Sequence, residues 1–178
     1  MVKPGSQLHL GSSRKKNEVR IEYLYLDLNT CDRCMGTDSV LEEVIGVLTP
    51  AFALAGYTVT YRKTLVATEQ DAILHKLVSS PTIRVNGRDI CASVQENDCS
   101  SCGDIAGTQV NCRVYTYKGK QYEVPPAEML AEAILKAAFA PRANISRAEN
   151  YILPDNLGNF FTGKARKCCE GSSSCKCC

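Results

Sequence analysis

The chain has 178 residues, 44% of them hydrophobic, and a formal net charge of +2. This length favours one medium-sized domain with appendages and excludes two large domains. No apolar run approaches the roughly 18 residues of a membrane-spanning helix, and the weak net charge gives no nucleic-acid footprint, so we expect neither membrane insertion nor a nucleic-acid partner.

The first 18 residues are polar and lack the apolar segment of an export signal, so we expect a flexible lead-in (1–18) and a cytoplasmic protein. The 11 cysteines are the outstanding feature of the composition. In a reducing compartment, cysteines are more often catalytic or metal-binding than paired in structural disulfides. They form three groups: Cys31 and Cys34; Cys91, Cys99, Cys102 and Cys112; and Cys168, Cys169, Cys175, Cys177 and Cys178.

Strands and helices alternate in the predicted domain, which covers residues 19–140. Residues 19–28 are apolar on both faces, which predicts a central strand covered by helices on both sides. In the helix that follows, Ser39 and Glu42 fit a capping box, and Pro50 should kink or end it. The elements predicted before residue 92 are strands at 19–28, 57–66, 82–85 and 88–91, and helices around 39–52 and 68–78.

Residues 126–139 predict a final helix, and residues 92–125 before it form an insertion. The insertion contains a second CxxC and a predicted hairpin with strands at 110–117 and 122–124. Residues 141–163 are a weakly patterned extension. Residues 164–178 are a tail rich in Cys, Ser and Lys, which we expect to be flexible.

The spacing of Cys31 and Cys34 suits thiol chemistry. Two intervening residues let both sulfurs reach disulfide geometry, and the start of a helix favours the thiolate form. We expect Cys31 to attack first and Cys34 to resolve the mixed disulfide. This exchange requires no cofactor, and its partner would be a protein thiol or disulfide.

The strand, CxxC, helix, strand, helix, Ser80-Pro81-Thr82, hairpin and terminal helix together resemble the thioredoxin superfamily, over residues 19–91 and 126–139. The resemblance implies an α/β fold with a central mixed β-sheet flanked by helices. It also implies that Pro81 is cis and packs beside the catalytic pair. The Gly36-Thr37-Asp38 that follows Cys34 is similar to the metal-binding loop of arsenical metallochaperones, which also have a thioredoxin-like fold.

The remaining cysteines favour metal binding. Cys99 and Cys102, with Cys112, have the spacing of a metal site in which Cys91 could be the fourth ligand; a second redox pair is the alternative. The tail cysteines could also bind a soft ion. The candidate metal ligands are Cys99, Cys102, Cys112, Cys168, Cys169, Cys175, Cys177 and Cys178, and the candidate ions are Zn, Hg, As and Cu.

Residues 21–139, with both CxxC motifs, Cys112-Arg113-Val114, Gly119 and Tyr122-Glu123, resemble a bacterial and archaeal thioredoxin-like family of unassigned function. Some thioredoxin-like proteins of this sort occur in systems that handle mercury or arsenic. Our first hypothesis is therefore dithiol–disulfide exchange linked to soft-metal detoxification, with a metal-handling protein as a further possible partner. The alternative is a non-catalytic metallochaperone. A metal or oxidant sensor is a third possibility, although no DNA-reading element is evident.

Overall fold

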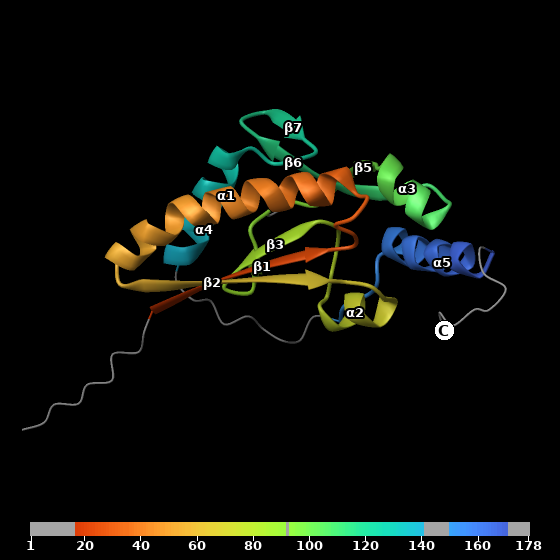
Figure 1. Ribbon diagram of the computed structural model, residues 1–178, viewed down its shortest axis with the longest axis horizontal. Helices are drawn as coiled ribbons and strands as arrows, with labels where there is room; N and C mark the ends of the chain where they lie inside the picture. Colours follow the sequence, from red (N-terminus) through yellow and green to blue (C-terminus); the bar gives the residue numbers. More distant parts are fainter. Residues whose placement is uncertain (1–16, 92, 141–149, 171–178) are drawn as a thin grey trace, which may run out of the picture.

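The protein is described by a computed structural model that covers residues 17–91, 93–140 and 150–170 (Figure 1). Its fold is mixed α/β. In chain order the elements are β1 (Asn17–Tyr25), α1 (Asp32–Leu54), β2 (Tyr57–Leu65), α2 (Glu69–Leu74), β3 (Thr82–Val85), β4 (Arg88–Asp89), β5 (Gln95–Asp98), α3 (Ser100–Ala106), β6 (Asn111–Tyr117), β7 (Lys120–Tyr122), α4 (Ala127–Phe139) and α5 (Asp155–Glu170). Within these ranges, no helix has the length and apolar character needed to cross a membrane.

The main sheet has the strand order β2-β1-β3-β4. β1 pairs parallel with β2, because α1 returns the chain to the same end of the sheet, and it pairs antiparallel with β3. Asn86 and Gly87 form the turn between β3 and β4 with φ angles of 53° and 81°, as a tight hairpin requires. The predicted element order before residue 92 is confirmed, although β4 ends at Asp89 instead of Cys91.

One face of the main sheet carries most of its core. Val19, Ile21 and Tyr23 of β1 are buried together with apolar residues of α1, α4 and β3. On the opposite face, Arg20 is exposed, and α2 lies below the strands in Figure 1, near the end of β1 that carries Leu24. α2 has six residues and β1 has nine, so α2 is too short to cover the whole strand. The helix cover predicted for both faces of β1 is therefore present on this second face only near the end that carries Leu24.

The first residue of α1 differs from the sequence prediction. The helix begins at Asp32, immediately after Cys31, and not near Ser39. The capping box predicted from Ser39 and Glu42 is therefore interior to the helix. Because Cys31 has an extended backbone and stands at the N-cap position, both cysteines of the first CxxC belong to the start of one helix.

Pro50 does not end α1, which continues to Leu54. Phe52, which is buried, lies just beyond the proline and packs on Tyr57 and Phe139 with ring centroids 6.3 and 5.8 Å away. This aromatic packing holds the last turn although Pro50 donates no backbone hydrogen bond.

The insertion forms a second sheet with the order β5-β6-β7. The predicted hairpin is present as β6 and β7, with β7 at Lys120–Tyr122 instead of 122–124. Two elements were not predicted: β5, and α3, which begins within the second CxxC. Both are short and polar, so neither has an apolar periodicity that the sequence could reveal.

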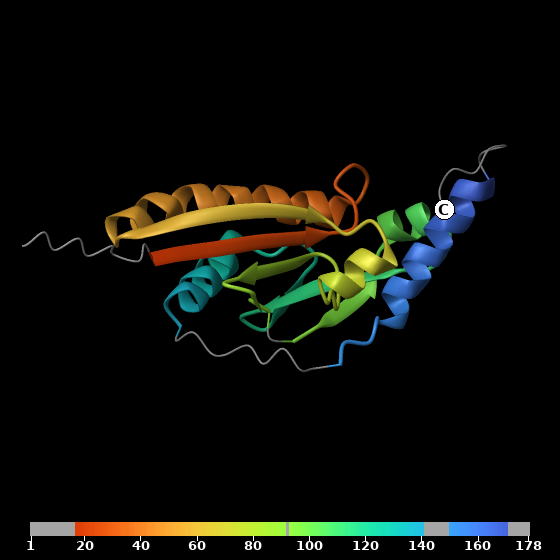
Figure 2. The same cartoon turned by 90° about the horizontal axis from the view of Figure 1, so that it is seen from below.

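The C-terminal helix α5 overturns part of the predicted tail. It packs against α3 at one end of the molecule (Figure 2). Leu157, Phe160 and Phe161 are buried at a spacing of three and four residues, which is one face of a helix. The prediction of a flexible segment from Lys164 is therefore wrong for residues 164–170, and residues 171–178 lie outside the described part of the chain.

Candidate functional site: a buried four-cysteine centre

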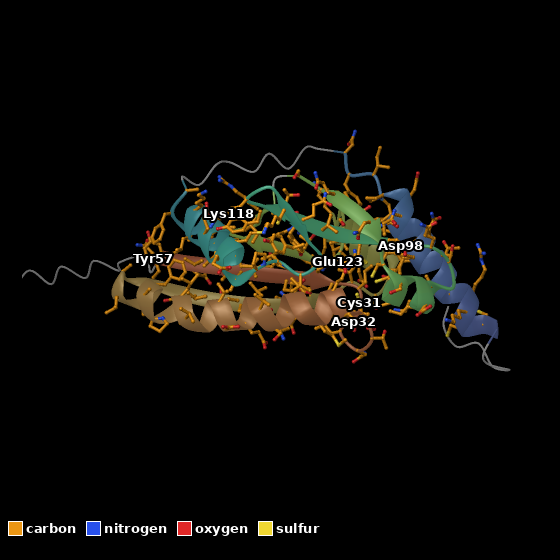
Figure 3. The ribbon with its side chains drawn as sticks, turned by 90° about the horizontal axis from the view of Figure 1, so that it is seen from above. Cys31, Asp32, Tyr57, Asp98, Lys118 and Glu123 are labelled. Carbon is orange, nitrogen blue, oxygen red and sulfur yellow. The ribbon has the colours of Figure 1, made fainter. Side chains whose placement is uncertain are left out.

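The loop after β1 fixes the position of the first CxxC. The Asp27 carboxylate accepts hydrogen bonds from the backbone N–H groups of Asn29, Thr30 and Cys31, at 2.6–3.2 Å. These bonds order the turn that leads into α1. Cys31 and Asp32 consequently lie at the end of α1 that faces Asp98 of the insertion (Figure 3).

The insertion supplies three further cysteines from adjoining elements. Cys99 directly follows β5 and is the N-cap of α3, and Cys102 lies in the first turn of that helix. Cys112 belongs to β6, in register with Asn97 of β5. Pairing between the two strands therefore brings Cys112 beside the start of α3.

Four sulfur atoms meet between α1 and the insertion. They belong to Cys31, Cys99, Cys102 and Cys112, and all lie within 4.8 Å of one another. The Cys102 Sγ is 3.5 Å from that of Cys31 and 3.3 Å from that of Cys112. Each of these residues is at most 3% exposed. We call these four residues the four-cysteine centre.

The spacing of these sulfurs suits a single metal ion. In a tetrahedral thiolate site with metal–sulfur bonds of about 2.3 Å, neighbouring sulfurs are about 3.8 Å apart. Two of the separations in the four-cysteine centre, 3.3 and 3.5 Å, fall just below that value, and the upper limit of 4.8 Å lies above it. Side-chain movements of less than about 1 Å would therefore convert the centre into a four-thiolate site.

Cys34 is buried but is not one of these four. Its Sγ lies 3.7 Å from Ser80 Oγ, and its carbonyl accepts a 2.7 Å hydrogen bond from the Tyr23 hydroxyl. The Ser80–Pro81 peptide is cis, as the resemblance implied. Cys34 therefore lies against the segment that contains Pro81, while Cys31 lies against the insertion.

Strand β6 also packs against the Pro81 segment. The backbone N–H of Arg113 donates a 2.8 Å hydrogen bond to the Ser80 carbonyl, and the Tyr115 hydroxyl donates one of 3.2 Å to the Pro81 carbonyl. The space beside Pro81 is thus occupied by the protein's own strand. That strand presents Cys112 to Cys31.

Arg33 fastens the insertion to the start of α1. Its Nη2 donates to the Asp98 carbonyl at 2.5 Å, and its Nη1 donates to the Cys112 carbonyl at 3.2 Å. Nη2 also forms a 2.6 Å ion pair with Glu123. Asp98 directly precedes Cys99. The buried Arg33 guanidinium therefore links the backbone at Cys99 and at Cys112 to the start of α1, where Cys31 stands.

The thiols within the centre differ in proton affinity. Hydrogen bonds from Cys102 and then Cys112 favour the thiolate of Cys31 and lower its pKa, and the same two neighbours lower the pKa of Cys99 to about 7. The pKa of Cys34 is raised, first by its hydrogen bond to Cys31 and then by burial. In the metal-free centre the thiolate form is therefore favoured at Cys31, whereas Cys34 favours its protonated form.

Helix α5 forms part of the apolar cover of the centre. Leu157, Phe160 and Phe161 belong to the same buried cluster as the four cysteines and Cys34. α5 approaches α3 closely at Gly163, where a Cβ atom would overlap the carbonyl oxygen of Ala106. These contacts exclude water from the side of the centre formed by α3.

The structure separates the remaining candidate ligands from the centre. The sequence suggested Cys91 as the fourth ligand, but Cys31 takes that place. Cys91 lies beside Asp89, and the backbone N–H of Cys91 donates a hydrogen bond to the Asp89 carboxylate. Cys168 and Cys169 are exposed at the end of α5 and line a hollow of about 820 Å³ with residues of α2. The other three tail cysteines, Cys175, Cys177 and Cys178, lie outside the described residues.

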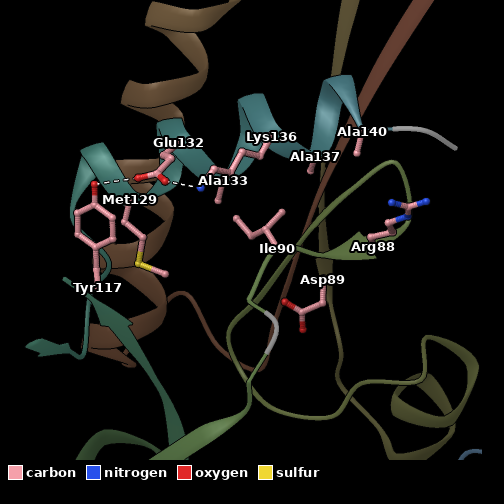
Figure 4. A pocket seen from close by; sticks show the side chains of 10 residues that line it. All are labelled: Arg88, Asp89, Ile90, Tyr117, Met129, Glu132, Ala133, Lys136, Ala137 and Ala140. Atoms are coloured by element: carbon pink, nitrogen blue, oxygen red, sulfur yellow. Dashed lines mark hydrogen bonds and ion pairs between the residues drawn. The ribbon is translucent and has the colours of Figure 1, made fainter. Parts of the chain in front are cut away.

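A separate pocket of about 380 Å³ lies between α4, β4 and the end of β6 (Figure 4). Its Glu132 carboxylate accepts hydrogen bonds from Tyr117 and Lys136, at 3.1 and 2.5 Å. Ile90 and Met129 are among the apolar residues that line it. No cysteine lines this pocket, so it is distinct from the four-cysteine centre.

Sequence reasoning missed two contributions to the centre. Arg33 stands between the two cysteines of the first CxxC, and nothing in the sequence indicates that it is buried and holds the insertion in place. The apolar face of α5 was missed because Leu157, Phe160 and Phe161 stand in an otherwise polar segment. Their helical spacing was the available signal.

A family model described as a domain of unknown function (DUF2703) matches residues 19–134. No curated protein and no solved structure gives a match. The matched residues contain the main sheet, the insertion and the whole four-cysteine centre, whereas α5 lies beyond them. Because this match covers well over half of the chain, the protein belongs to the family described as a domain of unknown function, DUF2703.

Proposed function

We propose that this protein binds a soft metal or metalloid ion at the four-cysteine centre. The observation that carries the proposal is the convergence of four buried sulfurs, all within 4.8 Å of one another, from three separate elements. Buried cysteines need not converge in this way to form a core. Cys102 and Cys31 are 71 positions apart in the chain, so the fold itself builds the cluster.

The donor set defines the class of ion. Four thiolates with no oxygen or nitrogen donor among them favour Zn(II), Cu(I), Hg(II) or As(III) over hard cations such as Mg²⁺. Four protein ligands also leave no open coordination position for a substrate. The proposed role is therefore to hold or deliver the ion, in a metallochaperone or a detoxification system.

The fold in this proposal is thioredoxin-like. Supporting it are the strand order β2-β1-β3-β4, the parallel pairing of β1 with β2, the CxxC at the start of α1 and the cis peptide before Pro81. On this interpretation, the insertion of β5, α3, β6 and β7 is what adds three ligands to a redox scaffold.

Dithiol–disulfide exchange is the second candidate function. It is favoured by the position of Cys31 and Cys34 in the first turn of a helix, beside the Pro81 segment. A protein partner would have to approach Cys31 beside Pro81, and β6 occupies that space. Because Cys31 and Cys34 are fully buried, exchange with another protein ranks second to ion binding.

A binding experiment tests the first candidate. The full-length protein, with its five C-terminal cysteines replaced by serine (C168S, C169S, C175S, C177S and C178S), should bind one equivalent of Zn(II) or Cd(II), and Cd(II) should give the ultraviolet absorption of cadmium thiolates. Cys102→Ser should lose at least about tenfold in affinity, because this sulfur contacts two others. Cys91→Ser is the matched control.

Two results would overturn the proposal: no stoichiometric binding of Zn(II), Cd(II), Hg(II) or As(III), or equal affinities for Cys102→Ser and Cys91→Ser. The second candidate has its own assay, reduction of a protein disulfide by the wild type and by Cys31→Ser. Turnover that survives Cys31→Ser would exclude exchange at this CxxC.

A further inference from the structure

Cys31 belongs to two groups of thiols at once. Within the four-cysteine centre, its sulfur receives a 3.5 Å hydrogen bond from Cys102. Within the CxxC, it is separated from Cys34 by one helical turn, a spacing at which a disulfide can form. A Cys31 sulfur bonded to Cys34 cannot also be a thiolate ligand.

Cys34 is placed to take Cys31 out of the centre. Its sulfur is directed to Ser80 Oγ, and it is not one of the four sulfurs that could hold an ion. Cys34 therefore remains a thiol when the four cysteines of the centre bind an ion. It is a resolving thiol next to a ligand, a role that a purely structural metal site would not need.

From this arrangement, and on the basis of the ion-binding function proposed above, we propose that the protein releases its ion when a small-molecule disulfide oxidises Cys31 and Cys34. The shared sulfur makes ion binding and the CxxC disulfide mutually exclusive. The protein is then an ion donor whose delivery depends on the thiol–disulfide balance of its surroundings.

The chemistry consists of two exchange steps. Cys31 is fully buried, so the exchange begins with a local opening between α1 and the insertion that exposes its sulfur. The Cys31 thiolate then attacks one sulfur of the small disulfide RSSR, forms a Cys31–SR mixed disulfide and releases RS⁻. The Cys34 thiol then gives up its proton and displaces the second RS⁻, which takes that proton and leaves as RSH. Cys31 and Cys34 lose two electrons in total, and RSSR gains them.

Losing Cys31 leaves three ligands, Cys99, Cys102 and Cys112, all on the insertion. Loss of an outer-shell partner alone lowers metal affinity roughly 10–100-fold. Loss of a first-shell thiolate should therefore lower the affinity for Zn(II) at least about 100-fold, which is enough to transfer the ion to an acceptor.

The test uses the full-length protein with the five C-terminal cysteines replaced by serine, loaded with one equivalent of Zn(II). It is equilibrated with glutathione and glutathione disulfide over a series of ratios. A chromophoric zinc chelator reports release, and mass spectrometry of peptides locates disulfides. The same series is run on Cys34→Ser and, as the matched control, on Cys91→Ser. For each variant, the Zn(II) released is corrected for the affinity of its reduced form for Zn(II).

We expect one Zn(II) released for each Cys31–Cys34 disulfide formed, and recovery of binding after reduction. Cys34→Ser should need at least about a tenfold higher proportion of glutathione disulfide for half release, because only a mixed disulfide can then occupy Cys31. Cys91→Ser should match its parent.

Three results would overturn this inference: equal midpoints for Cys34→Ser and its parent, a disulfide that joins two members of the four-cysteine centre, or retention of Zn(II) by protein whose Cys31–Cys34 disulfide has formed. Failure of the reduced protein to bind any soft ion would instead overturn the ion-binding function itself.

Discussion

Replacing Arg33 by glutamine should weaken ion binding and destabilise the protein without removing any sulfur. The guanidinium donates to the carbonyls of Asp98 and Cys112, at 2.5 and 3.2 Å. Hydrogen bonds from a charged donor contribute roughly 1.5–3 kcal/mol each, and glutamine can keep one of the two. The ion pair with Glu123 adds little, since that carboxylate is 59% exposed.

The free energy of unfolding of the metal-free protein should therefore fall by about 1.5–3 kcal/mol. Because Arg33 sets the position of backbone next to Cys99 and Cys112, affinity for Cd(II) should fall roughly 10–100-fold, as it does for outer-shell partners elsewhere. Urea unfolding and a Cd(II) titration against a competing chelator measure the two quantities. Arg33→Lys should lie in between, because an ammonium cannot reproduce the fork of the guanidinium.

The exposed Arg62 on β2 provides a matched control, and Arg62→Gln should change neither quantity. The reasoning is refuted if Arg33→Gln binds Cd(II) within about twofold of the wild type. Arg33 would then serve the stability of the fold alone, and the insertion would hold its ligands without help from α1.

Three further changes test the environment of the centre. Gly163→Val should cost about 1–3 kcal/mol of unfolding free energy, because its side chain would push α5 away from α3; Gly46→Ala, with no atom near its Cβ position, should be neutral or slightly stabilising in urea unfolding. Affinity for Zn(II), measured by chelator competition, should fall as the pH drops from 8 to 6. Protons compete with the ion for thiolates such as Cys99, whose pKa is about 7 without metal. A flat pH profile would contradict thiolate ligation. Phe160→Ala should lower the free energy of unfolding by about 3–5 kcal/mol and speed hydrogen exchange in α3. Phe139→Ala is the control and should lower it much less, because Phe139 is half-exposed. Equal losses of unfolding free energy would show that α5 does not cover the centre.

Local signals were enough to predict the alternation of strands and helices before residue 92. Asn86 with Gly87 dictates a hairpin, and Thr68 caps α2 through a capping box in which Asp71 takes part. The same kind of signal failed at Ser39, where a good capping pattern lies inside α1. The helix begins earlier because it continues from the turn ordered by the Asp27 carboxylate.

The composition of the centre could be predicted only in part. The second CxxC and Cys112 were identified as candidate ligands from their spacing, but Cys91 was the expected fourth member. Which cysteine completes the set depends on how the insertion docks on α1, and that docking is fixed by Arg33 and by pairing of β6 with the Ser80 segment. Such long-range contacts leave no periodic trace in the sequence.

The division of the ligands between α1 and the insertion has a consequence for unfolding. The sulfurs of Cys31 and Cys102 are separated by 71 positions of chain, so an ion held by both would act as a cross-link that closes a long loop. Closing such a loop restricts the unfolded chain far more than the folded one. A bound ion should thus merge the main sheet and the insertion into one cooperative unit, while the metal-free protein can open the insertion separately.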